Sequence, residues 1–259
     1  MGPLHGIGVL VTRAEQQAGP LCRRLEALGA GTLRLPAIEI EACGDGRKSG
    51  VSIGALDTFD IIVFTSANAV RFGSALLEQR RDLTLAAIGP ATARALNESG
   101  YEVVVQPQRG FDSEALLAHP GLEHPSARRI LLIKGAGGRG MLAEELTRRG
   151  ADVRAIDVYR RIPATPSAAQ LAVVQEELAA GRLHVITATS LDVGSHLLDV
   201  VPDTLRAQFQ RVHWLVPGER VAAGLRGRGL GAPLLTAASA EDQDLVAALL
   251  RWRSSESEA

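Results

Sequence analysis

Two Thr-Ser pairs occupy similar positions in the chain, each directly after a short apolar run and before a helical pattern. They read Thr65-Ser66-Ala67-Asn68 and Thr189-Ser190. Hydroxyls and backbone N–H groups at a helix start bind carboxylate or phosphate groups well. Each serine can instead cap its own helix, and for either pair alone capping is the simpler interpretation. Two pairs at equivalent places favour a site for an anionic ligand.

Two further turns combine glycine and proline between an apolar run and a helical pattern. They are Gly89-Pro90 and Pro217-Gly218. Proline suits the first turn of a helix, and glycine lets a ligand approach the backbone closely. Turn formation alone explains the same residues equally well.

Residues 135–140 read Gly-Ala-Gly-Gly-Arg-Gly, which matches the G-x-G-x-x-G pattern of dinucleotide-binding turns. The run follows an apolar strand pattern, and Asp157 stands near the place where such a fold has the acid that binds the ribose. However, the equivalent turn at residues 13–17 lacks these glycines, and Lys134 separates the run from the apolar strand. A nicotinamide or flavin site is therefore the minor interpretation.

Tyr159 follows Asp157 and Val158 in a stretch without helical periodicity. A phenol in such a place can donate a proton or a hydrogen bond to a leaving group. A strand tyrosine that is half-packed on the protein surface has the same sequence surroundings. From the residues alone, the packing interpretation is the stronger one.

Short apolar or β-branched runs alternate with amphipathic helical patterns along the whole chain. The predicted strands are residues 8–12, 60–65, 85–88, 102–105, 129–133, 184–187, 212–216 and 234–236, and the clearest helices are 16–28, 91–96 and 141–149. Several strands are apolar without alternation, as in strands that are covered on both faces. The alternation predicts an α/β fold with mostly parallel sheets and helices on both faces.

The chain also contains an internal repeat. Residues 9–13 match residues 130–134, which lie 121 positions later. The two Thr-Ser pairs are 124 positions apart, and Gly89 and Gly218 are 129 positions apart. This shared order indicates one ancestral α/β unit that is present twice, with small insertions in its loops. Two extended segments, residues 33–41 and 153–163, occupy equivalent places in the repeats, either as sheet strands or as linkers.

Length and composition restrict the class of protein. The 259 residues are enough for two domains of about 130 residues each. The net charge of −1 argues against a nucleic-acid binder, which needs a basic surface. Two scattered cysteines fit a reducing cytoplasm, and no apolar run reaches the length of about 18 residues that a membrane span needs. The six histidines show no ligand spacing, so no metal is expected.

Taken in order, these motifs resemble the uroporphyrinogen-III synthase family. The resemblance is carried by Val11-Thr12-Arg13, Leu35-Pro36-Ala37-Ile38, residues 64–70, Ala87-Ile88-Gly89, Ser113-Glu114-Ala115-Leu116-Leu117, Lys134-Gly135, Val158-Tyr159-Arg160, Ala188-Thr189-Ser190 and Val216-Pro217-Gly218. It covers residues 7–250. Each motif is short, and the ordered set is far more specific than any one of them.

The resemblance implies two flavodoxin-like lobes with parallel sheets, joined by a two-stranded linker, with a ligand cleft between the lobes. One lobe is then residues 1–36 plus 163–259, the other is residues 37–162, and the linker strands lie near 33–41 and 153–163. In this arrangement the glycine run is a turn at the mouth of the cleft. We further expect a cytoplasmic monomer of heme and porphyrin biosynthesis that uses no cofactor and binds neither nucleic acid nor a membrane.

The implied enzyme is a lyase that acts on hydroxymethylbilane, a flexible chain of four pyrroles with eight carboxylates. The bilane loses water and closes with inversion of its last ring to give uroporphyrinogen III, so holding one geometry is the main task of the protein. Tyr159 matches the family's tyrosine and is expected to help the hydroxyl leave as water. The expected substrate-binding residues are Thr12, Arg13, Ser66, Ala67, Asn68, Gly89, Lys134, Gly135, Thr189, Ser190, Pro217 and Gly218. Lys134 stands where an arginine is also usual, and lysine offers a point charge rather than a forked contact.

Two alternatives to the synthase stay open at this point. The first is a dinucleotide-dependent oxidoreductase that uses residues 135–140 and Asp157. The second is a non-enzymatic sensor that holds a small molecule between two lobes. Cofactor binding to the pure protein separates the first alternative from the synthase.

Overall fold

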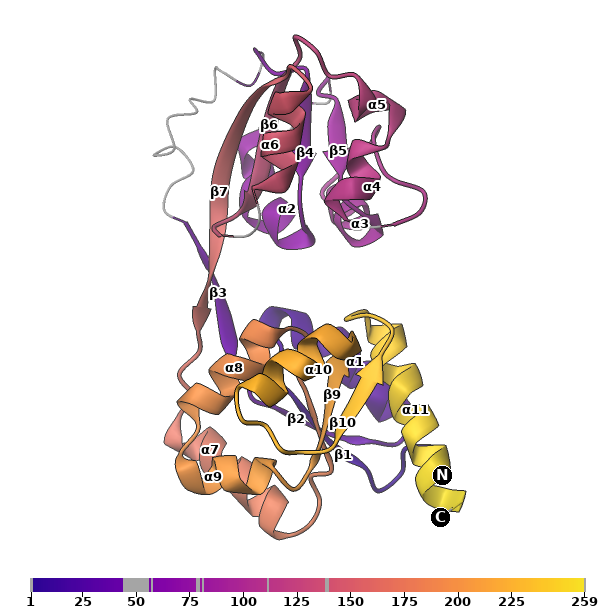
Figure 1. Ribbon diagram of the computed structural model, residues 1–259, viewed down its shortest axis with the longest axis vertical. Helices are drawn as coiled ribbons and strands as arrows, with labels where there is room; N and C mark the ends of the chain where they lie inside the picture. The colour runs from indigo at the N-terminus through magenta and orange to yellow at the C-terminus, as the bar shows by residue number, and fades with distance from the viewer. Residues whose placement is uncertain are drawn as a thin grey trace. The chain divides into compact units, whose positions relative to one another are not determined.

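The computed structural model describes residues 2–43, 56, 58–77, 80, 82–110, 112–137 and 140–258. The chain divides into two units, which are residues 1–39 with 162–259 (unit 1) and residues 40–161 (unit 2). Unit 1 is therefore discontinuous in sequence, and unit 2 is a continuous segment inserted within it (Figure 1).

Unit 1 is built on a sheet whose spatial order is β2-β1-β8-β9-β10, with every pair parallel. Its strands are β1 (Gly8–Val11), β2 (Gly31–Arg34), β8 (Val185–Thr187), β9 (His213–Pro217) and β10 (Leu234–Ala237). Its helices are α1 (Glu15–Ala27), α7 (Ala168–Ala179), α8 (Leu191–Val200), α9 (Asp203–Phe209), α10 (Gly218–Gly227) and α11 (Asp242–Glu258). Numbered along unit 1, the strand order is 2-1-3-4-5, which is the flavodoxin-like order.

Four strands of unit 2 have the same spatial arrangement as four strands of unit 1, but they occur in a different order along the chain. Its sheet runs β3-β7-β6-β4-β5, from β3 (Ile38–Ala42), β4 (Ile61–Phe64), β5 (Leu85–Ala87), β6 (Arg129–Gly135) and β7 (Asp152–Pro163). The helical segments are α2 (Ala67–Gly73), η3 (Ser74–Leu77), α3 (Pro90–Glu98), α4 (Ser113–Leu117), α5 (Pro120–Glu123) and α6 (Met141–Arg148). Strands β7, β6, β4 and β5 hold the places of β2, β1, β8 and β9, so the repeat seen in sequence is a repeat of topology.

The prediction of a full strand at residues 102–105 is wrong. Only one bridge forms there, between Ala86 and Val105, at the place that β10 holds in unit 1. The side chain of Val104 is 62% exposed, and Pro107 follows closely. A proline has no N–H to donate to a strand ladder, which ends the pairing early.

The extended segment predicted at residues 33–41 is two strands, β2 and β3, which are separated around Pro36. Strand β3 runs antiparallel to β7, because Cys43 N–H donates to the Val158 carbonyl while Ala164 N–H donates to the Ala37 carbonyl. The chain crosses from unit 1 to unit 2 within β3 and returns within β7. Both extended segments are thus sheet strands and also the two connections between the units.

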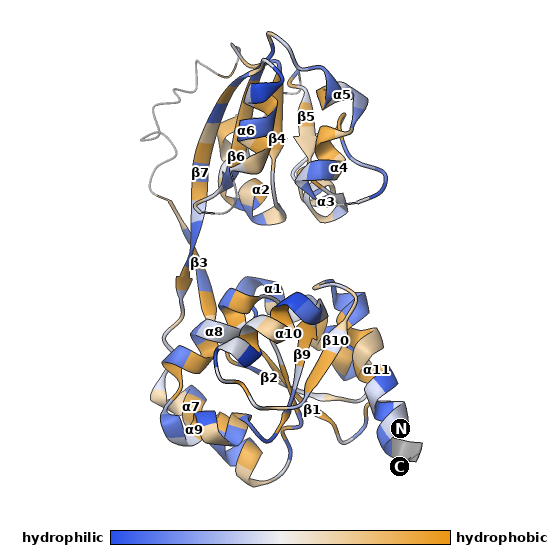
Figure 2. Cartoon of the chain, viewed as in Figure 1, coloured by the Kyte–Doolittle hydropathy of each residue, from blue (hydrophilic) through white to orange (hydrophobic). Residues whose placement is uncertain are grey.

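The central strands are apolar because helices cover both faces of each sheet. All four residues of β4 are buried, and Figure 2 shows this strand in hydrophobic colours. In unit 1, Val9 and Val11 pack with Leu21 of α1 and Leu245 of α11. Among the described residues, no helix is both long and apolar enough to cross a membrane.

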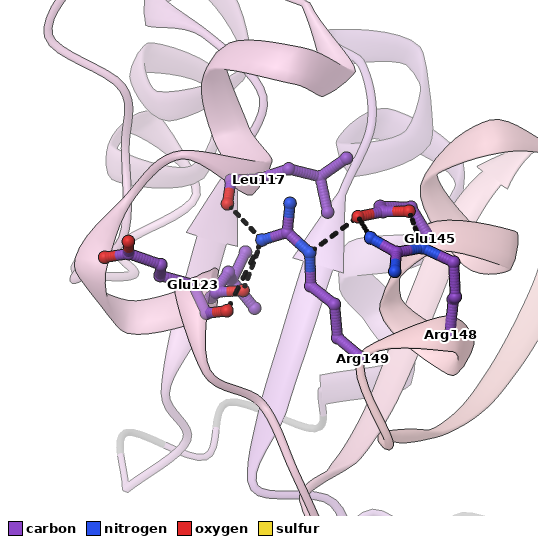
Figure 3. A network of polar contacts seen from close by, with 6 residues as sticks. Leu117, Glu123, Glu145, Arg148 and Arg149 are labelled. Atoms are coloured by element: carbon purple, nitrogen blue, oxygen red, sulfur yellow. Dashed lines mark hydrogen bonds and ion pairs between the residues drawn. The ribbon is translucent and has the colours of Figure 1, made fainter.

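Arg149, at the end of α6, forms hydrogen bonds that connect α4 and α5 to α6 (Figure 3). Its guanidinium donates to the Leu117 carbonyl at 2.6 Å and to Glu145 Oε1 at 2.8 Å. Weaker bonds reach the carbonyls of Leu122 and Glu123 at 3.4 and 3.5 Å. Carbonyls at a helix end have no partner within the helix, and Arg149 supplies partners to α4 and α5 together.

Candidate functional site

Unit 2 has a pocket at the carboxyl ends of its central strands. In an open α/β sheet, ligands bind outside the carboxyl ends of the strands at the point where the connections reverse direction, which here is between β6 and β4. A pocket of about 180 Å³ opens at this point. Its lining is Thr65, Ile88, Ser113, Leu132, Lys134, Gly135, Ala136, Gly137, Gly140, Leu142, Ala143, Tyr159 and Arg161.

A bulge in β7 turns Tyr159 toward this pocket. In β7, Ile156 and Val158 are buried on either side of the exposed Asp157, but Tyr159, the residue after Val158, is buried as well. The register explains this, because Lys134 pairs with Asp157 and Gly135 pairs with Tyr159, which leaves Val158 as the extra residue. A bulge re-aims the side chain that follows it. The tyrosine predicted from sequence therefore lines the pocket.

The Tyr159 ring fits because position 135 has no side chain. A Cβ atom built on Gly135 would lie 2.5 Å from Cζ of Tyr159, which is far closer than atoms can approach. Phe72 stacks on the ring with centroids 6.0 Å apart, and Arg161 Cζ lies 5.9 Å from the ring centroid. Tyr159 is only 4% exposed. These three neighbours hold the phenol in one orientation.

The Tyr159 hydroxyl lies 3.1 Å from the hydroxyl of Ser66. Ser66 is the N-cap of α2 with extended backbone, and its Oγ accepts the Ala69 N–H at 3.0 Å. Ser66 therefore caps α2, which is the simpler of the two roles that the sequence allowed. Ser66 also contacts the Tyr159 hydroxyl. The sequence did not predict this contact, which joins two of the predicted site residues.

Lys134 lines the pocket and is held by Asp157. The Lys134 Nζ atom lies 2.7 Å from Asp157 Oδ1, and it also donates to the carbonyls of Gly135 and Gly137 at 3.3 and 3.4 Å. Asp157, which the dinucleotide alternative assigns to a ribose, is therefore the partner of a lysine. Residues 138 and 139 of the glycine run lie outside the described residues.

In unit 1 the corresponding strand-end residues Thr12 and Arg13 make internal contacts. Thr12 is fully buried, and its hydroxyl donates to the Thr187 carbonyl. Arg13 forms an ion pair with Asp242 and donates to the Ala240 carbonyl at the start of α11. The contacts that the structure gives both residues tie strand β1 to its own unit.

The other predicted residues stand at helix starts. Ser190 caps α8 by accepting the Val193 N–H at 3.2 Å, directly after Thr189. Ala67 and Asn68 begin α2, Gly89 precedes α3, and Pro217 and Gly218 join β9 to α10. Gly218 has φ +73°, a backbone conformation that favours glycine. Within unit 2, the structure thus brings together Tyr159, Ser66, Lys134 and Gly135, with Ala67 and Asn68 directly after Ser66.

Two polar residues of the pocket, Ser113 and Arg161, were not predicted as site residues, and Thr65 was singled out only as part of its Thr-Ser pair. Arg161 stands two residues after Tyr159 on the same strand, and alternate strand residues share a face. That spacing was the available signal for Arg161. Ser113 comes from α4, a separate part of the chain, and sequence spacing holds no signal that brings it to β6.

Comparison with known proteins gives consistent results. A family model described as "Uroporphyrinogen-III synthase HemD" matches residues 20–247. The uroporphyrinogen-III synthase of Escherichia coli K12 is 30% identical over 215 residues, which are 81% of this chain and 84% of that protein. The synthase of Salmonella typhimurium LT2 is 33% identical over 216 residues, with the same coverage of 81% and 84%.

Solved structures agree at the level of the fold. A uroporphyrinogen-III synthetase from Helicobacter pylori 26695 aligns with a TM-score of 0.62 at 14% identity, over 95% of this chain and 99% of that one. A mutant synthase from Thermus thermophilus gives 0.59 at 21% identity, over 98% and 100%. The predicted pair of parallel α/β sheets is confirmed, and the chain belongs to the uroporphyrinogen-III synthase family.

Proposed function

We propose that the protein is a lyase that closes hydroxymethylbilane to uroporphyrinogen III, with loss of water and inversion of the last pyrrole ring. Family membership supports the reaction class. The observation that carries the proposal is the Tyr159 hydroxyl, which is held beside Ser66 at a pocket lined by two basic side chains, Lys134 and Arg161.

In the proposed reaction, Tyr159 gives its proton to the hydroxyl that leaves the first ring. The C–O bond breaks, water departs, and the positively charged azafulvene that remains is attacked by the far end of the bilane through a spiro intermediate. The proton that is released when the ring closes restores the Tyr159 phenol. No metal or cofactor takes part. Without protein the bilane closes without inversion, so the enzyme contributes by holding one geometry as well as by donating the proton.

The substrate's carboxylates are proposed to meet the predicted strand-end turns. In unit 2, Lys134 supplies charge, and the free N–H groups at the starts of α2 and α3, near Ala67, Asn68 and Gly89, supply hydrogen bonds. In unit 1, the turns at Thr189-Ser190 and Pro217-Gly218 take the same role. Thr12 and Arg13 are proposed only as supports for these turns, because the structure gives both internal partners.

The test is an assay in which hydroxymethylbilane is generated in place and the oxidised products are separated by isomer. A predominance of the type III isomer would establish the activity. A folded sample that yields only type I would overturn it, and nicotinamide titration would then test the oxidoreductase alternative. The Tyr159→Phe variant is expected to form type III slowly, and an unchanged rate would remove Tyr159 from the reaction.

The same preparation tests the predicted oligomeric state. We expect a monomer by light scattering, and we expect the enzyme to act in the cytoplasm as part of porphyrin and heme biosynthesis. A dimer in solution would contradict the first of these expectations without affecting the reaction.

A further inference from the structure

Ser66 stands between the start of α2 and the Tyr159 hydroxyl. Its Oγ atom accepts the Ala69 N–H at 3.0 Å and lies 3.1 Å from Oη of Tyr159. A serine hydroxyl has one hydrogen and two lone pairs. The cap uses one lone pair, which leaves the hydrogen and the second lone pair for Tyr159.

Two arrangements of the hydrogens are compatible with this contact. If Tyr159 donates to Ser66, the Ser66 hydrogen needs another acceptor. If Ser66 donates to Tyr159, it is the Tyr159 hydrogen that is free. In the described part of the chain, neither hydroxyl makes a further hydrogen bond. Tyr159 lines the pocket and Ser66 is not among the lining residues, so a free Tyr159 hydrogen is the one that can point toward the pocket.

We propose that Ser66 is a positioning residue that donates its hydrogen to the Tyr159 oxygen and thereby directs the Tyr159 O–H into the pocket. This inference rests on the proposed function. As the C–O bond of the substrate breaks, both electrons stay with the oxygen, which takes the Tyr159 proton and leaves as water. The phenolate that remains keeps the negative charge, and the Ser66 O–H is already aimed at it.

This role differs from direct binding of a substrate carboxylate, which the sequence predicts for Ser66. A binding residue changes KM whether or not Tyr159 has a hydroxyl. A positioning residue changes kcat, and only while that hydroxyl is present. The two roles are therefore separable by kinetics in two backgrounds.

The experiment compares Ser66→Gly, Ser66→Thr and Tyr159→Phe with the Ser66→Gly/Tyr159→Phe double variant, measuring kcat and KM with isomer separation. Glycine is nearly as good an N-cap as serine but has no hydroxyl, and threonine keeps both the cap and the hydroxyl. Ser167→Gly is the matched control, because Ser167 caps α7 by accepting the Gln170 N–H at 3.2 Å and takes no part in the site.

We expect Ser66→Gly to lower kcat roughly tenfold, the loss typical of one hydrogen bond to a charged group. KM should stay within about a factor of two, since no binding contact is removed. Ser66→Thr should restore most of the rate, and Ser66→Gly should cause no further fall in the Tyr159→Phe background. The Ser167→Gly control should match the wild type.

Three results would overturn the proposal: a wild-type kcat in Ser66→Gly, an equal fall in both backgrounds, or a rise of KM in both. In each case a wild-type enzyme that forms type III leaves the proposed function standing. A wild type that forms only type I overturns both. Should Ser66→Gly fail to fold, Ser66→Asp carries the same test, because aspartate caps a helix but has no hydrogen to donate.

Discussion

Units 1 and 2 share the arrangement of four strands, but the cations at the carboxyl ends of the equivalent strands β1 and β6 have different roles. Arg13 in unit 1 and Lys134 in unit 2 are equivalent cations, and each has a carboxylate partner. The partner of Arg13 is Asp242 at the start of α11, and the Arg13 side chain is 14% exposed. The partner of Lys134 is Asp157 on the adjacent strand, and Lys134 is 28% exposed at the pocket. The same position of a repeated fold is thus structural in one copy and faces a pocket in the other.

The capping serines show the same division. Ser66 and Ser190 both accept the N–H of the third residue beyond them. Only Ser66 has a tyrosine beside it, because the residue equivalent to Tyr159 in unit 1 is Ile38, which is buried in β3. The duplicated cap is therefore common to both units, and the hydroxyl that is proposed to react belongs to unit 2.

Of the substitutions considered, Gly135→Ala should have the largest effect on the difference between the units, because it displaces Tyr159 from its place beside Ser66. Gly135→Ala places a Cβ atom where the Tyr159 ring now lies, so the ring must leave its position. We expect kcat to fall on the order of a hundredfold, as when a general acid is lost. Gly227→Ala is the control, since a Cβ there meets nothing within 4 Å. A Gly135→Ala enzyme with nearly normal kcat would show that the fixed ring is unnecessary.

The two cations can be compared by their effects on stability. Arg13→Met removes the ion pair with Asp242 and the bond to the Ala240 carbonyl, and it should lower the free energy of unfolding by about 2 kcal/mol. Lys134→Met removes a more exposed pair and should cost less than about 0.5 kcal/mol. Urea unfolding measures both values. Equal losses would contradict the division between a structural and a pocket-facing cation.

For activity, we expect the opposite order, with a larger effect at Lys134 than at Arg13. Lys134→Met removes a positive charge from the pocket, and we expect KM for the bilane to rise about threefold to tenfold, while kcat changes little. Lys134→Arg keeps the charge and serves as the control. An unchanged KM in Lys134→Met would remove this lysine from substrate binding.

Acid should destabilise unit 2 through Glu145, whose contact with Arg149 has no equivalent in unit 1. Hydrogen bonds from Arg148 and then Arg149 lower the pKa of Glu145 from 4.5 to about 2. Since the pKa is depressed in the folded state, the stabilisation is complete above pH 4.5 and is lost as the pH falls toward 2. Leu28 occupies the position of Arg149 in unit 1. An acid titration followed by circular dichroism should show a smaller loss between pH 4.5 and 2 in Glu145→Gln.

Much of the fold followed from local sequence patterns. Apolar runs gave seven of the eight predicted strands to within two residues at each end, because central strands of a parallel sheet are buried on both faces. The strand at residues 102–105 failed because pairing there stops at one bridge. The repeat gave the shared topology, since equivalent motifs occur in the same order.

The site was predictable only in part. Tyr159, Ser66, Lys134 and Gly135 stood out as residue types in sequence, and the structure brings them together. The bulge at Val158 that turns Tyr159 toward the pocket depends on the register between β6 and β7, which no local pattern contains. The pairing of Arg13 with Asp242 joins positions far apart in sequence, so it arises only when unit 1 is assembled.

The interrupted sequence of unit 1 has a consequence during synthesis on the ribosome. Its apolar cluster joins Leu21 and Leu25 from the beginning of the chain to Leu245 and Leu249 near its other end. Unit 2 is continuous, so all of it is translated before strands β8, β9 and β10 are made. Domains fold as units as they emerge. Unit 2 is therefore completed before unit 1. The apolar faces of β1, α1 and β2 stay uncovered until α11 has been translated.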